Sequence, residues 1–160
     1  MPLKALSDVL WRERELLEQL LFKLEVEQLF LVSGRTKRLP LATREVEELL
    51  ETIRAAELGR AVEVDDAATT LSLPGGVSLL DLAHAAPAPW DGILLEHRKH
   101  FIRLTAEINE IAQSNRDLLA SSHRATQETL MSLRESVHTY DPRGAAAATP
   151  TGAQLLDETF

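Results

Sequence analysis

The side chains best suited to chemistry in this sequence are two histidines and a glutamate within five residues. Glu96, His97 and His100 stand in LLEHRKHF, and histidines three positions apart share one face of a helix. Imidazole and carboxylate groups bind Zn²⁺, but a tetrahedral site needs further ligands, and none follows at a motif spacing. His97 also fits the apolar stripe of its own segment. The pattern therefore favours His97 as an ordinary interior residue over a metal ligand.

Other catalytic arrangements are equally weak. The segment SGRTKR contains one glycine and follows no predicted strand, so it does not match a phosphate-binding loop. No serine lies in a nucleophile elbow, and the chain contains no cysteine. Carboxylate pairs such as Glu47–Glu48 and Asp65–Asp66 lie in charged stretches that are typical of solvated surface. The sequence therefore predicts neither an enzyme nor a bound metal or cofactor.

The composition points to a small helical protein. The chain has 160 residues, which predicts one domain, and 44% of them are hydrophobic while only 4% are aromatic. Leu, Ala, Val and Ile must then fill the interior, which is typical of helical bundles and coiled coils. A net charge of −8 disfavours binding to nucleic acid or to anionic membrane surfaces. With no signal-peptide pattern and no membrane-length apolar run, we expect a soluble, cytoplasmic protein.

Leucine recurs at every seventh position of the first segment. The positions are Leu3, Leu10, Leu17, Leu24 and Leu31. This repeat predicts a helix over residues 3–32 that winds gently against a partner helix and ends at Gly34. Five charged residues are expected to lie away from the stripe: Arg12, Arg14, Glu18, Glu25 and Glu27. A helix packed within one chain is favoured over a zipper between chains.

Two further helices follow. Pro40 belongs in the first turn of a helix that runs to about residue 68. The apolar positions of this second helix are Leu39, Val46, Leu49, Leu50, Ile53, Ala56 and Val62. After the turn Pro74-Gly75-Gly76, Ser78 and Asp81 form a capping pair for a short helix over residues 79–86. The short turn between the first two long helices makes them antiparallel neighbours.

The last and longest helix is expected from Trp90 to Val137. Its stripe reads Leu94, His97, Phe101, Leu104, Ile108, Ile111, Asn115 and Leu118. Asn115 is the polar member of this stripe, and we interpret it as fixing helix register, in preference to contacting a ligand. After Leu119 the stripe is diluted by Ser and Thr, leaving Ala125, Leu130, Met131, Leu133 and Val137. A diluted stripe predicts a helix that either frays or depends on a partner.

The sequence thus predicts an all-α protein, an elongated antiparallel helical bundle or coiled coil of three long helices plus one short helix. Residues 1–139 form the bundle domain, and residues 140–160, rich in Ala, Pro and Gly, form a disordered, flexible tail. The connector RTKRLP carries Arg35, Lys37 and Arg38. These cations could contact an acidic partner, although the pattern favours a solvated turn next to the negative end of the first helix.

The order of these segments resembles a known family. The similarity lies in three segments in this order: the leucine-rich WRERELLEQLLFKLEVEQLFLVSGR, TREVEELLETIRAAELGRAVEV and LTAEINEIAQSNRDLLASS. Over residues 6 to about 135, the chain is similar to the FlgN-type flagellar export chaperones in their actinobacterial style. The resemblance implies a cytoplasmic chaperone that binds hook–filament junction (hook-associated) proteins and keeps them monomeric. It would then deliver them to the flagellar type III export apparatus, whose export gate and ATPase complex would be further partners.

The resemblance also implies binding residues. The family's cargo contacts correspond by position to Leu118, Leu119, Leu130, Met131, Leu133 and Val137. Tyr140, the only tyrosine, precedes Asp141-Pro142 and is similar in position to a tyrosine with which related chaperones dock on the export gate. A tyrosine that only covers the helix end is the alternative. We expect a monomer or a weak homodimer. The alternative function is a self-assembling coiled-coil structural or adaptor protein that joins chains through the stripe of residues 3–31.

Overall fold

A computed structural model describes residues 1–137 of the chain, with side chains described through Glu135. The regular structure of these residues is α-helical, with no strand among them. Its elements are α1 (Pro2–Ser33), α2 (Leu39–Thr70), α3 (Leu79–Ala85) and α4 (Trp90–Val137). The prediction of an all-α bundle with three long helices and one short helix is confirmed. The expected tail of residues 140–160 lies outside the described residues.

The helix ends follow local sequence signals. Gly34 takes a left-handed conformation with φ of 70°, which ends α1 at little steric cost. Pro40 stands in the first turn of α2, where its missing N–H has no helical acceptor to lose. At α3, Ser78 Oγ accepts a hydrogen bond from the Asp81 N–H, and the Asp81 carboxylate accepts one from the Ser78 N–H, both at 3.1 Å. These capping contacts confirm the predicted start of the short helix.

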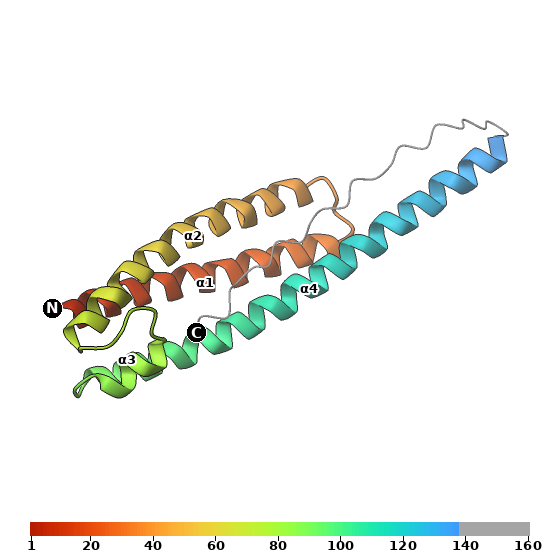
Figure 1. The fold of residues 1–160 in the computed structure, drawn as a ribbon. Helices are drawn as coiled ribbons and strands as arrows, with labels where there is room; N and C mark the ends of the chain where they lie inside the picture. Colours follow the sequence, from red (N-terminus) through yellow and green to blue (C-terminus); the bar gives the residue numbers. More distant parts are fainter. Residues whose placement is uncertain (138–160) are drawn as a thin grey trace.

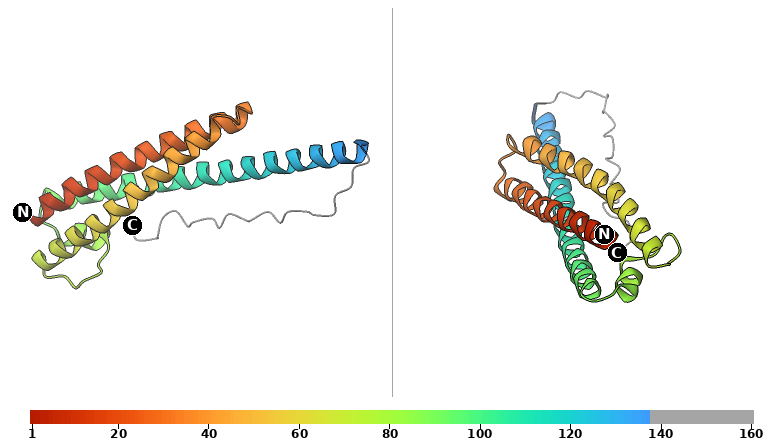
Figure 2. Two further views of the ribbon diagram at one scale, coloured as in Figure 1. Left: turned by 90° about the horizontal axis from the view of Figure 1, so that it is seen from above. Right: turned by 90° about the vertical axis from the view of Figure 1, so that its left-hand side faces the viewer.

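Helix α1 lies at the centre of the arrangement. Ion pairs join Glu13 to Arg60 and Lys23 to Glu45, so residue numbers rise along α1 as they fall along α2. The two helices are therefore antiparallel, as expected from their short connection. Figures 1 and 2 show them as a hairpin whose turn lies at the end of α1 far from the N-terminus, with α4 continuing past it.

Helix α4 runs parallel to α1. Ser7 faces His97 and Leu24 faces Asn115, so residue numbers rise together along the two helices. Helix α1 packs against both α2 and α4, whereas no Cα atom of α2 lies within 8 Å of one in α4. The short α3 packs on the first turns of α4 and reverses the chain there (Figure 1). The described residues form an elongated up–down–up bundle.

The leucine stripe of α1 supplies much of the core. Its buried members are Leu3, Leu6, Leu10, Leu16, Leu17, Leu20 and Leu24. A zipper between chains would need the same side chains, and they are already buried within one chain. The favoured prediction of an intramolecular bundle helix is confirmed, and the stripe is not available for the alternative self-assembling coiled coil.

Three expectations about individual residues are wrong. Glu27 was expected to lie away from the stripe of α1, but it is half-buried and accepts a hydrogen bond from Asn115 of α4. Val62 was expected on the apolar stripe of α2, but it is 60% exposed. It follows Ile53 by nine residues, which is two and a half helical turns, so it lies on the opposite face. Arg14 was expected to lie away from the stripe of α1, but it is buried between α1 and α4. Its long apolar stem allows this burial while the guanidinium finds polar and aromatic contacts.

Candidate functional site

Helix α4 is covered by the rest of the bundle along only part of its length. Buried residues of its stripe extend from Leu94 to Asn115, and Leu118 is half-buried. Every described residue from Leu119 to Glu135 is exposed. At about 1.5 Å per residue, the segment of residues 119–137 is roughly 27 Å long. We call it the overhang; Figures 1 and 2 show it extending past the α1–α2 turn.

The overhang continues the apolar stripe of the covered half. Leu119 follows Asn115 by four residues, and Leu133 and Val137 follow Leu130 by three and seven. At 100° per residue these positions return to the face that carries Phe101 and Ile108 earlier in the helix. Leu119, Leu130 and Leu133 are 49%, 51% and 56% exposed. A face that is core in one half of α4 is therefore surface in the other.

Met131 stands apart from the other proposed contact residues. It is 60% exposed, but it lies 100° from Leu130 and so projects away from the stripe. The structure therefore places Leu119, Leu130 and Leu133 on one face of α4, and the last described turn of the backbone contains Val137. The side chain of Val137 and all of Tyr140 lie outside the described residues. Leu118 lies beside the stripe where the covered half ends.

The two flanks of the overhang differ in chemistry. On the helical wheel, Arg116 and Arg134 lie on one flank of the stripe, with His123 between them along the helix. The other flank carries the small side chains of Ser122 and Thr129. Three acidic residues, Asp117 just before the overhang and Glu128 and Glu135 within it, lie on the rear of the helix with Arg124. A chain with a net charge of −8 thus presents cations next to its exposed apolar stripe.

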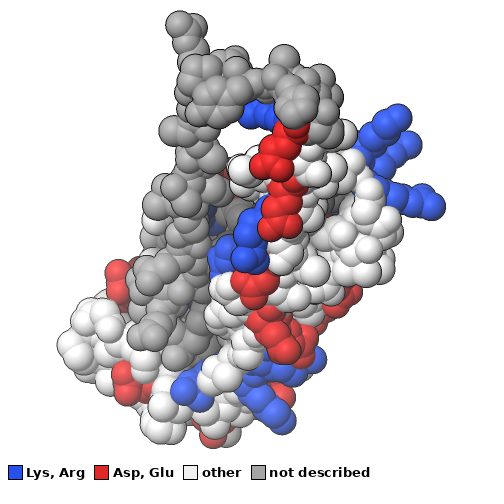
Figure 3. All heavy atoms as spheres, turned by 90° about the vertical axis from the view of Figure 1, so that its right-hand side faces the viewer, with Lys and Arg blue, Asp and Glu red and all other residues white. Residues whose placement is uncertain are grey.

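The α1–α2 turn lies where the overhang begins. Gln28 Nε2 donates to Ser114 Oγ at 3.1 Å, and Val32 and Leu118 lie one helical turn further along each helix. Val32 is 70% exposed. Figure 3 looks at this end of the molecule and shows Lys and Arg side chains projecting from its surface.

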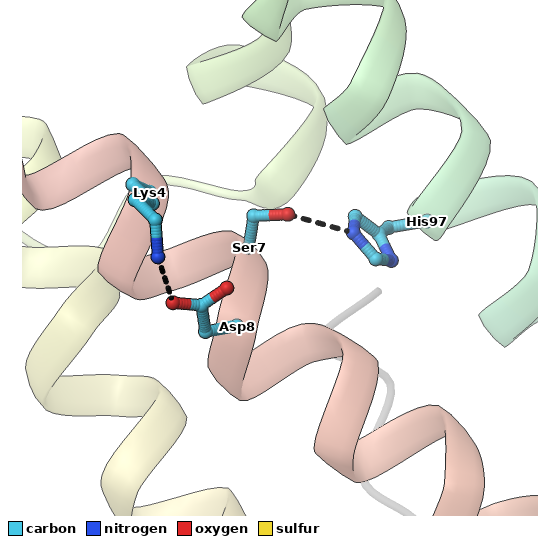
Figure 4. A network of polar contacts seen from close by, with 4 residues as sticks. All are labelled: Lys4, Ser7, Asp8 and His97. Carbon is cyan, nitrogen blue, oxygen red and sulfur yellow. Dashed lines mark hydrogen bonds and ion pairs between the residues drawn. The ribbon is translucent and has the colours of Figure 1, made fainter.

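Buried polar contacts join α1 to the start of α4. Ser7 Oγ lies 3.2 Å from His97 Nε2, as Figure 4 shows, and Arg14 lies 3.4 Å from His97 Nδ1. Because a guanidinium only donates, Nδ1 must accept, and the Nε2–H then donates to Ser7. The guanidinium of Arg14 also stacks on Trp11, 4.1 Å from the ring centroid. Burial, and next the Arg14 charge, lowers the pKa of His97 to about 4.

This geometry confirms His97 as an interior residue of the helix stripe. Both of its ring nitrogens face α1, while His100 lies near the surface with Arg103. No group of three His, Asp or Glu side chains within residues 1–137 is placed to hold a metal ion. Sequence reasoning missed Ser7 and Arg14 as partners of His97, because they stand 90 and 83 residues away and no local pattern marks them.

A second buried polar pair joins α1 to α2. Glu13 is fully buried, and its carboxylate lies 3.1 Å from the guanidinium of Arg60. Desolvation raises the pKa of Glu13 to about 7, although the Arg60 charge acts in the opposite direction. The sequence offered one signal for this residue: Glu13 stands between Leu10 and Leu17, within the arc of the α1 stripe. The pair lies deep in the bundle, so we interpret it as structural.

Asn115 closes the covered half of α4. Its Nδ2 donates to the Leu24 carbonyl at 2.9 Å and to Glu27 at 3.1 Å. It is 3% exposed, so the prediction of a polar residue buried in the stripe is confirmed. These two hydrogen bonds align Asn115 of α4 with residues 24–27 of α1. They therefore fit the predicted role of Asn115 in fixing the register of the two helices.

The fold and this surface define a class of protein: an elongated helical bundle whose longest helix carries an exposed apolar stripe beyond the bundle core. None of the helices within residues 1–137 combines the length and the apolar character needed to cross a bilayer.

The family model described as FlgN protein matches residues 1–148, and the chain belongs to the FlgN family. This is a family of flagellar export chaperones, not of enzymes. Comparison with curated proteins and with solved structures gives no match.

Proposed function

We propose that this FlgN-family protein is a cytoplasmic export chaperone for hook-associated flagellar proteins. It would bind these hook–filament junction proteins as cargo, keep them monomeric and deliver them to the flagellar type III export apparatus. The observation that carries the proposal is the stripe of α4, which continues past its cover with Leu119, Leu130 and Leu133 about half exposed. Apolar residues spaced by three, four and seven on an exposed helix face suit docking against another helix.

The cargo surface would comprise Leu118, Leu119, Leu130, Leu133 and Val137. A helix seated there would extend the packing that α1 gives to the covered half. Met131 was expected among these residues by resemblance, and it would contact only a cargo that reaches around the helix. Because the bundle core ends before Leu119, cargo can leave without unfolding the scaffold.

The test is binding of the chain to the hook-associated proteins of its own organism, by calorimetry and by co-purification. Leu130→Ser with Leu133→Ser should weaken cargo binding by about thirtyfold or more, since each buried anchor contributes roughly 1–3 kcal/mol. Melting should be nearly unchanged. Met131→Ser, an equally exposed residue on another face, is the matched control and should have a much smaller effect. If no hook-associated protein binds the wild-type chain, the proposed function is wrong.

A second step of the proposal concerns Tyr140, which lies outside the described residues. A phenol combines a large apolar face with one hydrogen-bonding tip, and such side chains are effective anchors at interfaces. We propose that Tyr140 docks on the export gate. Tyr140→Ala should leave melting and cargo affinity as they are, yet weaken gate binding and reduce cargo secretion. Wild-type secretion by this variant would show that the tyrosine only covers the helix end.

A further inference from the structure

The α1–α2 turn carries three cations with no described counter-charge. Arg35, Lys37 and Arg38 are exposed, and none forms an ion pair with a carboxylate of residues 1–137. The chain as a whole is acidic, with a net charge of −8 that already includes these three cations. A local group of like charges costs repulsion unless something compensates it.

One compensation lies within the bundle. The last turn of α1 contains no basic residue, so the turn cations next to it face the negative end of the α1 dipole. This effect fades within about one helical turn and is screened by salt. The helix dipole therefore accounts for one cation near the end of α1. It does not account for all three.

The position of the turn relative to the overhang suggests what else the cations do. The hydrogen bond from Gln28 to Ser114 joins α1 to α4 about two helical turns before the α1–α2 turn, and the exposed stripe begins with Leu119. A helix lying on the stripe in the place that α1 has in the covered half would end against the turn. Arg116 then lies beside that same end, on the flank of the stripe.

We propose that the turn binds the acidic, C-terminal end of an amphipathic helix of the cargo, so that the cargo helix lies antiparallel to α4. This inference rests on the proposed function and adds the chemistry and the direction of the docking segment. A helix C-terminus carries the negative end of its dipole, and acidic side chains there would add to it. In the opposite direction, the positive N-terminal end would meet Arg35, Lys37 and Arg38.

The first test compares two triple variants of the full chain, each of which replaces three cations with neutral glutamines. Arg35→Gln, Lys37→Gln and Arg38→Gln together remove three charges at the turn. Lys4→Gln, Arg12→Gln and Lys99→Gln remove three exposed charges at the other end of the bundle and keep the net charge matched. The turn variant should bind the hook-associated cargo about tenfold more weakly at low salt, mainly through slower association. The difference should shrink at about 0.5 M salt, and the control should bind like wild type.

The second test measures direction. The chain has no cysteine, so Thr36→Cys in the turn gives a single attachment point for a cross-linker. Cargo joined to this position should be linked near the acidic C-terminal end of its docking helix. Gln127→Cys, on the exposed overhang, should be linked nearer the N-terminal end of that helix. The reverse order would overturn the proposed direction.

Further results of the first test and of related variants would also overturn the inference. If wild type binds cargo and the turn variant binds equally well at low salt, the turn is only a solvated helix end, although the proposed function stands. If the turn variant changes the concentration dependence of sedimentation of the chain alone and leaves cargo affinity unchanged, the occupant is a second copy. The last six residues, LLDETF, contain two carboxylates, Asp157 and Glu158. If Asp157→Asn with Glu158→Gln reproduces the loss of salt dependence, the occupant of the turn is this segment of the chain itself. Absence of any cargo binding by wild type would reject the proposed function as well.

Discussion

The two halves of α4 share one pattern and differ in what covers them. Phe101, Leu104 and Ile108 are at most 1% exposed because α1 lies over them. Leu119 and Leu130 occupy the same face, yet about half of each side chain is exposed. Helix formation is equal in the two halves, so periodicity alone does not make a residue core. An apolar stripe becomes core only as far as a second element reaches, and beyond that point it is a surface suited to a partner.

The largest expected difference between the halves is in amide hydrogen exchange. Amides of residues 119–137 should exchange on the order of a thousandfold faster than those of residues 97–112. The overhang opens without exposing buried side chains, whereas the covered half opens only by separating α1 from α4. Exchange read by mass spectrometry checks this, and cargo should slow exchange in the overhang alone. Equal protection in the two halves would show that the overhang is covered in solution.

A matched pair of truncations sharpens the comparison. Leu104→Ala in the covered half should lower the free energy of unfolding by about 2–5 kcal/mol, since it leaves a cavity in the core. Leu130→Ala, the same change on the same face of the overhang, should lower it by less than about 0.5 kcal/mol. Denaturant titration measures both. Similar losses for the two variants would mean that Leu130 belongs to the core and is not a contact for cargo.

The sequence predicted the helix bounds well because their causes are local. Gly34, Pro40 and the pair Ser78–Asp81 act within a few residues of the ends that they set. The dilution of the stripe after Leu119 also indicated where cover ends. What could not be predicted are contacts made across the fold. The burial of Arg14 depends on a histidine 83 residues away, and no periodicity in either helix reveals that pairing.

A third prediction uses pH to weaken the covered half. The pKa of His97 is about 4 in the folded protein, below its ordinary value of 6.5. Between these two pH values His97 is protonated in the unfolded chain but not in the folded chain. The free energy of unfolding therefore decreases as pH falls from about 6.5 to 4. The loss should be on the order of 2 kcal/mol. His97→Gln should remove this part of the pH dependence, measured as free energy of unfolding against pH.

Glu13 supplies a control of opposite sign. Its pKa of about 7 lies above the ordinary 4.5, so the folded chain holds the extra proton and stability is lost as pH rises from about 4.5 to 7. Glu13→Gln should remove that loss and leave the contribution of His97 in place. If both variants flatten the profile in the same direction, the assignment of these two slopes is wrong.

Only a small effect is expected at Asn115, the border between the halves. Asn115→Leu removes two hydrogen bonds to α1, but it also removes a buried Oδ1 that has no hydrogen-bond partner among the described residues and adds apolar contact. These effects oppose each other, so the free energy of unfolding should change by less than about 1 kcal/mol. The register of α1 against α4 should become less sharply defined, because leucine packs at several levels of a stripe.

The boundary of amide protection near Leu118 should then broaden, while Asn109→Leu on the exposed side of α4 should leave it unchanged. A loss above about 2 kcal/mol would show instead that the hydrogen bonds to Leu24 and Glu27 stabilise the covered half.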